Sequence, residues 1–237
     1  MAEILLTAGF ASTKRQVDRT AQALSEHYNK DVEGITYTDA LRKTGAFFSG
    51  RELVVTHSGG IDALDRSSVK AERVISIAPP VPHTITGLVT RGFKKMRQCE
   101  DAFGGTFKQS SLYEGLSHSM RSMQQIRNLS NVNGFEIAHD LAKRGTDMTL
   151  ALMSDDGLFD YQSHEAQEAW FDATSPHVAN KVKVTEVAGD HIRFTNDPVK
   201  VLGEIAAAKL LSSPRFISRL HTSPSAQPVP SVALATA

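Results

Sequence analysis

The stretch from residue 53 to residue 60 constrains the fold more than any other part of this chain. Leu53–Thr56 is a short apolar run typical of a buried strand, and it leads directly into His57, Ser58, Gly59 and Gly60. A pattern with helical spacing follows at once. The order of these patterns predicts a strand, a tight turn and a helix, with the serine in the turn and its hydroxyl at the edge of a sheet.

Strand and helix patterns alternate along most of the remaining sequence. Strands are expected at residues 4–6, 32–37, 53–56, 73–78, 148–153 and 182–187, and helical segments at 14–28, 38–48, 60–68, 163–171 and 198–211. Alternation at this spacing favours a mostly parallel sheet covered on both faces. We therefore expect an α/β fold with a sheet of about six strands and helices on both faces.

One segment interrupts the alternation. Residues 83–145 contain three helical patterns, at 87–103, 112–129 and 135–143, and no convincing strand. We expect this segment to be a helical cap or lid inserted into a core formed by residues 1–82 and 146–211. Residues 212–237 are rich in Ser, Pro and Ala and are expected to form a disordered tail.

Composition limits the classes of partner. Lysine plus arginine and aspartate plus glutamate both number 26, so charge gives no reason to expect nucleic acid or an acidic membrane as partner. The one cysteine forms no disulfide within the chain and no zinc cluster, and no apolar run approaches the roughly 20 residues of a membrane span. We expect a cytoplasmic protein without a metal or other cofactor, and leave its oligomeric state open.

Two further stretches combine with the serine turn into a recognisable order. The motif Thr56-His57-Ser58-Gly59-Gly60 is followed by Ser154-Asp155-Asp156-Gly157 after a later strand, and by Gly189-Asp190-His191 after the last strand. In this order the chain resembles the α/β-hydrolase fold family, with a short amino-terminal part. The family motif is Gly-x-Ser-x-Gly, so Thr56 departs from it and Gly60 keeps it.

The resemblance implies specific roles for these residues. Ser58 would be the nucleophile, His191 the base and Asp156 the acid of a catalytic triad, although Asp155 stays open as an alternative acid. The backbone N–H groups of Gly59 and Phe10 would form the oxyanion hole. His57 would pack beside the turn.

The implied activity is cleavage of an ester or related acyl bond in a small-molecule substrate, through an acyl-enzyme intermediate. A thioesterase, an amide hydrolase or a carbon-carbon hydrolase would use the same triad. Each motif also has a plainer interpretation, because serine–glycine pairs form ordinary turns and paired aspartates begin turns or cap helices. A hydrolase-like protein that binds a ligand without turnover therefore also stays open.

Overall fold

The structure is a computed structural model of the 237-residue chain. The described residues are 2–9, 12–66, 71–82, 84, 86–87, 127, 129–159, 161 and 182–208.

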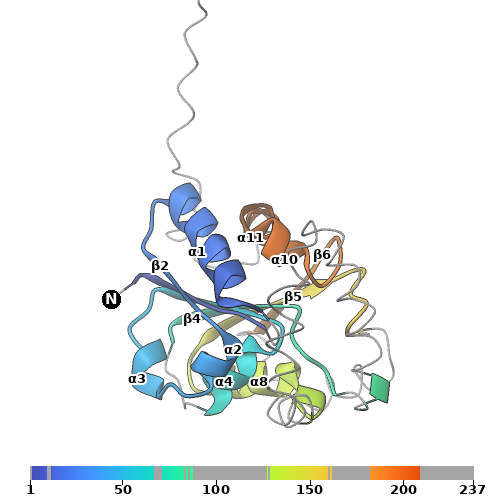
Figure 1. The fold of residues 1–237 in the computed structure, drawn as a ribbon. Helices are drawn as coiled ribbons and strands as arrows, with labels where there is room; N and C mark the ends of the chain where they lie inside the picture. The colour runs from blue at the N-terminus through green and yellow to red at the C-terminus, as the bar shows by residue number, and fades with distance from the viewer. Residues whose placement is uncertain are drawn as a thin grey trace, which may run out of the picture.

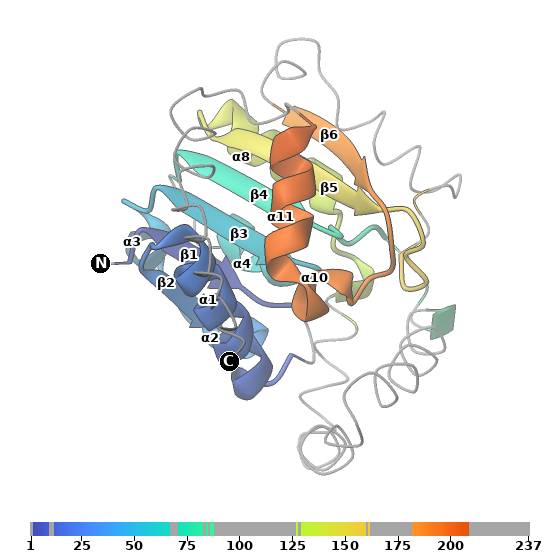
Figure 2. The same ribbon diagram turned by 90° about the horizontal axis from the view of Figure 1, so that it is seen from above.

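A six-stranded sheet forms the centre of the molecule (Figure 2). Its strand order is β2-β1-β3-β4-β5-β6, and every neighbouring pair is parallel. This confirms the α/β class and the parallel six-stranded sheet expected from the alternation. The strands are β1 (Ile4–Thr7), β2 (Val32–Ile35), β3 (Leu53–His57), β4 (Arg73–Ile77), β5 (Asp147–Met153) and β6 (Val182–Val187).

One face of the sheet is covered by α1 (Lys14–Tyr28), α10 (Arg193–Asn196) and α11 (Pro198–Ala207) (Figure 1). The buried side of α1 includes Val17 and Leu24, which pack in one cluster with apolar residues of α11 and of the sheet. A capping box at Thr13 begins α1, since the Thr13 hydroxyl accepts from the Gln16 N–H and the Gln16 side chain accepts from the Thr13 N–H.

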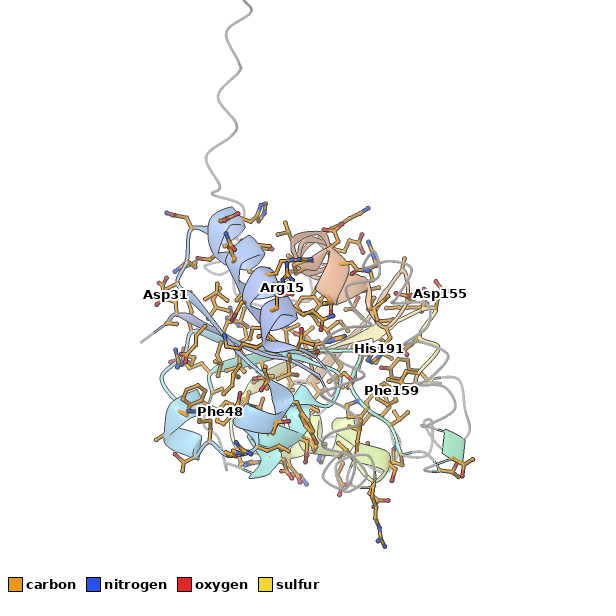
Figure 3. All side chains as sticks on the ribbon, viewed as in Figure 1. Arg15, Asp31, Phe48, Asp155, Phe159 and His191 are labelled. Carbon is orange, nitrogen blue, oxygen red and sulfur yellow. The ribbon has the colours of Figure 1, made fainter. Side chains whose placement is uncertain are left out.

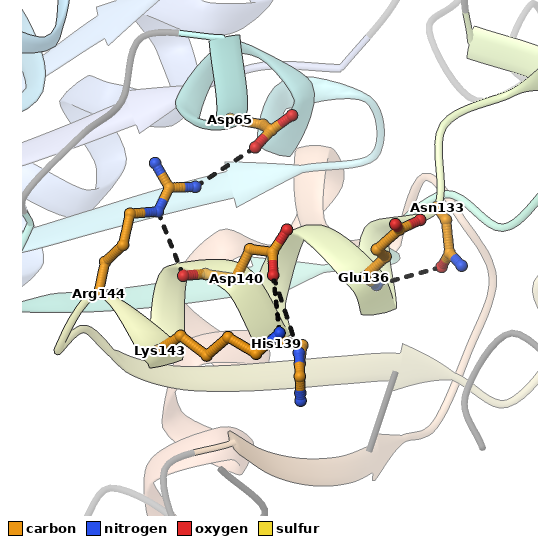
Figure 4. A network of polar contacts seen from close by, with 7 residues as sticks. All are labelled: Asp65, Asn133, Glu136, His139, Asp140, Lys143 and Arg144. Atoms are coloured by element: carbon orange, nitrogen blue, oxygen red, sulfur yellow. Dashed lines mark hydrogen bonds and ion pairs between the residues drawn. The ribbon is translucent and has the colours of Figure 1, made fainter. Parts of the chain in front are cut away.

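The opposite face carries α2 (Tyr37–Ala40), α3 (Gly45–Phe48), α4 (Gly60–Arg66) and α8 (Gly134–Lys143). Helix α8 lies against α4 and β5, although the sequence places it at the end of the expected insert. An ion pair between Arg144 and Asp65, 3.3 Å apart, joins the end of α8 to α4 (Figure 4). Asn133 caps the start of α8 by accepting from the N–H groups of Phe135 and Glu136.

One strand boundary differs from the sequence prediction by more than one residue. The strand expected to reach residue 37 ends at Ile35, and α2 begins at Tyr37. The Thr36 side chain accepts from the Asp39 N–H, which caps α2 and ends the strand early. The expected helical segment at residues 38–48 is two short helices rather than one.

Several predictions lie outside the described residues. These are most of the expected cap, the helix at 163–171, the tail at 212–237 and the proposed oxyanion donor Phe10. Within the described ranges, no helix is both long enough and apolar enough to cross a lipid bilayer.

Candidate active site

The three candidate triad residues all follow the carboxyl ends of strands. Ser58 comes directly after β3, Asp156 follows β5 and His191 follows β6. Because all six strands run parallel, these ends lie at one edge of the sheet, which is where open α/β sheets bind ligands. The topology therefore gathers residues that are up to 133 positions apart in the sequence at one edge.

Ser58 has an unusual backbone conformation. Its φ angle is +52°, in the left-handed region that L-residues other than asparagine and aspartate rarely adopt. The Ser58 N–H donates to the Ile77 carbonyl of β4 at 2.8 Å, which holds the turn against the neighbouring strand. Such strain persists only where the surroundings enforce it, and it is concentrated at functional sites. The serine is buried, with 3% of its surface exposed.

Two glycines allow the chain to pack tightly around Ser58. A β-carbon on residue 60 would lie 2.5 Å from the Thr7 carbonyl oxygen, and one on residue 9 would lie 2.7 Å from the Ser58 β-carbon. No real β-carbon tolerates such distances, so Gly60 and Gly9 are required by the close approach of β1 to the turn. The sequence predicted this requirement for residue 60 but not for residue 9.

Asp156 and His191 are joined by a hydrogen bond. His191 Nδ1 lies 2.8 Å from Asp156 Oδ2, and the two side chains are only 8% and 1% exposed, respectively. A carboxylate can only accept, so Nδ1 carries the proton and Nε2 of the neutral ring is left with a lone pair. This is the tautomer in which a histidine can act as a base through Nε2.

The Asp156 carboxylate is held in place by the start of its own loop. Its Oδ1 atom accepts from the N–H groups of Leu158 and Phe159, at 2.8 and 2.9 Å. Burial alone would raise the pKa of Asp156, but the His191 charge, the His191 hydrogen bond and these two N–H groups outweigh it and lower that pKa. The group is therefore ionised at neutral pH.

The neighbouring aspartate has different contacts. Asp155 is exposed, its N–H donates to the Gly189 carbonyl, and its carboxylate accepts from the Ser154 hydroxyl. Figure 3 labels Asp155 near the outside of the molecule, with His191 and Phe159 further inward. Of the two candidate acids, the structure therefore places Asp156 on the histidine.

Aromatic rings surround the imidazole of His191. The Phe159 ring meets it edge-on at 5.2 Å between centroids, and the His57 ring lies 5.0 Å away. Tyr161, whose hydroxyl donates to the Pro79 carbonyl, lies near Asp156; burial and then the Asp156 charge raise the Tyr161 pKa well above its ordinary value. Sequence reasoning assigned neither Phe159 nor Tyr161 a contact with His191 or Asp156, because the contacts of a loop side chain depend on how the loop packs.

One expected contact is absent between two described residues, and another involves a residue outside the described ranges. Among the described residues, no hydrogen bond joins the Ser58 hydroxyl to His191 Nε2. His57, the residue before Ser58, connects the two residues indirectly, because its ring contacts the ring of His191. Phe10, the second expected oxyanion donor, lies outside the described residues, whereas Gly59 stands directly before the first turn of α4.

A separate acidic cleft lies between α4 and α8, with a volume of about 370 Å³. Its carboxylates include Asp65, paired with Arg144, and Asp140, paired with Lys143 (Figure 4). Across the described residues, no group of three or more His, Cys, Asp or Glu side chains is arranged to hold a metal ion.

The sequence matches no family model, and no curated protein sequence matches it. Solved structures are similar over most of the chain. An esterase from Pyrococcus furiosus has a TM-score of 0.53 at 15% identity, covering 89% of this chain and 81% of that one. The type II thioesterase BorB from the borrelidin biosynthetic cluster also has a TM-score of 0.53, at 13% identity, covering 87% of this chain and 91% of that one.

The chain has the α/β-hydrolase fold. The resemblance inferred from the three sequence motifs is thus confirmed at the level of the fold. Sequence identities this low show the fold but not the activity, so the chemistry is argued from this chain's own residues.

Thr56, where this chain departs from the α/β-hydrolase serine motif, buries its hydroxyl in the sheet. It is fully buried in β3 and lies in register with Thr7 of β1 and Ser76 of β4. Within the described part of the chain, none of these three buried hydroxyls has a hydrogen-bond partner. An unpaired buried hydroxyl is unfavourable, so the Thr56 hydroxyl lowers stability relative to an apolar side chain of the same shape.

Proposed function

We propose that this chain is a serine hydrolase that cleaves an ester or related acyl bond, with Ser58, His191 and Asp156 as its catalytic triad. The observation that carries the proposal is the hydrogen bond from His191 Nδ1 to Asp156 Oδ2, because it leaves Nε2 as a base. The strained backbone of Ser58, at the same edge of the sheet, supports its role as the nucleophile.

The reaction would proceed in two steps. His191 Nε2 takes the Ser58 proton as Oγ attacks the acyl carbon, and the imidazolium then protonates the leaving group as an acyl-enzyme forms. A water molecule, activated by the same imidazole, hydrolyses the acyl-enzyme and releases the acid. The ionised Asp156 stabilises the imidazolium in both steps, and its lowered pKa keeps it charged at neutral pH.

The negative oxygen formed in each step requires hydrogen-bond donors. The Gly59 N–H is the first candidate, because it follows the nucleophile and precedes the first turn of α4, whose N–H groups have no acceptors within the helix. The Phe10 N–H, from the loop after β1, is the second. Loss of one such donor costs on the order of 3 kcal/mol in the transition state.

The substrate class is an acyl compound of small size. Two proteins of the same fold are named as an esterase and a type II thioesterase. Their names support an acyl compound as the substrate class but do not identify a particular bond. Thioesters, amides and carbon-carbon bonds would be cleaved by the same three side chains. The cap expected at residues 83–145 would determine the choice.

A fluorophosphonate probe tests the proposal directly, because it labels only an activated serine. We expect the probe to label the wild type and not Ser58→Ala. Ser49→Ala is the matched control, because Ser49 lies after α3, away from the candidate triad, and its hydroxyl donates to the Gly45 carbonyl. A folded wild type that the probe does not label would favour the ligand-binding alternative.

The bond type requires a second experiment. Acyl p-nitrophenyl esters of increasing chain length, together with acyl thioesters, should be compared on the wild type and on His191→Ala. We expect turnover by the wild type and its loss in the variant, since the variant has no base. Labelling by the probe without turnover of any ester or thioester would direct the search to amides and carbon-carbon bonds.

A further inference from the structure

His57 lies at the end of β3, directly before Ser58, and its side chain is buried. Its Nε2 atom lies 2.8 Å from the backbone carbonyl oxygen of His191, 134 positions along the chain. A carbonyl can only accept, so Nε2 of His57 carries the proton and donates it. His57, the residue beside the proposed nucleophile, is therefore hydrogen-bonded to the backbone of His191, whose ring is the proposed base.

We propose that His57 is a positioning residue, whose hydrogen bond to the His191 carbonyl fixes the base relative to the nucleophile. The inference rests on the proposed function, in which His191 is the base. His191 is then held at two points, since its ring bonds to Asp156 and its backbone bonds to His57. The first bond sets the orientation of the ring, and the second sets the height of its backbone above the end of β3.

The bond from His57 connects the loop that carries His191 to β3. It begins at Gly189, whose φ angle is +110°, and α10 begins only at Arg193. Elsewhere the loop is bonded by the Asp155 N–H to the Gly189 carbonyl and by the Arg193 N–H to the Asp190 carbonyl. These two bonds join the loop to itself and to the loop after β5, whereas the bond from His57 joins it to the strand that carries Ser58.

The surroundings of His57 keep it a neutral donor. Burial, and after it the charge of His191, lowers the pKa of His57 to about 3. Its ring also packs 5.6 Å from the ring of Phe194 in α10, and 5.0 Å from the ring of His191. The bond to the His191 carbonyl is therefore unchanged over the neutral range of pH in which the base must work.

Two substitutions separate the hydrogen bond from mere packing. His57→Gln retains an N–H near the position of Nε2, whereas His57→Met has a similar length and no donor. The rate of labelling by the fluorophosphonate probe should fall by about 10- to 100-fold in His57→Met, the effect of misplacing a catalytic group by about 1 Å, and return close to the wild-type rate in His57→Gln. His139→Met, at a buried histidine of α8, is the control and should react like the wild type.

The outcomes distinguish this inference from the proposed function. No labelling of the folded wild type would overturn the proposed function, and this inference would fall with it. A labelled wild type, with His57→Met equally fast or with both His57 variants equally slow, would overturn the inference alone. Should His57→Met not fold, the ¹⁵N NMR spectrum of the wild-type histidines provides the test. The inference requires His57 to stay in the Nε2–H tautomer between about pH 5 and 8, because its pKa of about 3 keeps the ring neutral throughout that range. A different tautomer would overturn the inference.

Discussion

Gly60 and the Thr7 carbonyl approach so closely that a β-carbon on residue 60 would lie 2.5 Å from the carbonyl oxygen. The contact joins the first residue of α4 to the last residue of β1. Because the obstacle is backbone rather than a flexible side chain, a larger residue would have to displace the strand or the helix. The turn that holds Ser58 lies immediately before this contact, so its geometry depends on the absence of a side chain there.

Gly60→Ala should therefore lower the free energy of unfolding by about 1–3 kcal/mol, the usual effect of overpacking a tight site. Gly203→Ala is the matched control, because a β-carbon on this glycine of α11 would meet no atom within 4 Å. That substitution should stabilise the protein by about 0.5–1 kcal/mol, since alanine favours a helix over glycine. Urea unfolding of the two variants measures both, and equal effects would contradict the steric argument.

Asp156→Asn should lower kcat by roughly 10³- to 10⁴-fold, because an amide can present its N–H group to the imidazole and favour the tautomer that cannot act as a base. Asp155→Asn should leave kcat near the wild-type value, since that exposed side chain accepts from the Ser154 hydroxyl and, among the described residues, has no other hydrogen bond. Steady-state kinetics on the best p-nitrophenyl ester makes the comparison. A larger loss in Asp155→Asn would show that the acid is residue 155.

His57 should make the protein sensitive to mild acid. Its pKa is about 3 in the folded state and 6.5 in an unfolded chain, so between these values the unfolded state binds a proton that the folded state does not. The free energy of unfolding should therefore fall by up to about 1.4 kcal/mol per pH unit as the pH drops below 6.5.

The variant His57→Gln should lack this contribution, so its stability should fall less steeply than that of the wild type between pH 6 and pH 4 in urea titrations at each pH. Asp156 also has a lowered pKa, but its contribution is lost only as the pH falls below its ordinary value of 3.8, outside this window. Parallel curves for the wild type and the variant would show that His57 titrates normally in the folded protein.

Thr56→Val should raise the free energy of unfolding by about 1 kcal/mol, because valine keeps the shape of the side chain and removes a buried hydroxyl without a partner. Thr146→Val is the matched control. Its hydroxyl is also buried but donates to the Ala71 carbonyl at 2.8 Å, so its loss should destabilise the protein by about 1 kcal/mol. Thermal melts compare the two, and destabilisation by both would mean that the Thr56 hydroxyl is paired in solution.

The sequence by itself determined the order of the elements and the positions of the proposed site residues along it. Short apolar runs such as Leu53–Val55 form buried strands, the alternating run Val182–Val187 forms an edge strand, and Ser58, Asp156 and His191 each follow a strand. These are local properties, because a run of apolar residues or a glycine after a serine limits the backbone wherever the chain folds. The boundary at Thr36 was predicted wrongly, because a cap formed by the Thr36 side chain and the Asp39 N–H outweighed the strand propensity of the residues beside it.

Only the tertiary structure decided which side chains meet. Asp155 and Asp156 are identical in type and adjacent, and the direction of each depends on how the loop after β5 packs against the loop after β6. The bond between His57 and His191, and the buried position of Thr56 without a partner, likewise depend on segments brought together by the sheet. Contacts between distant residues depend on the packing of the whole chain, and a single sequence carries no local signal for them.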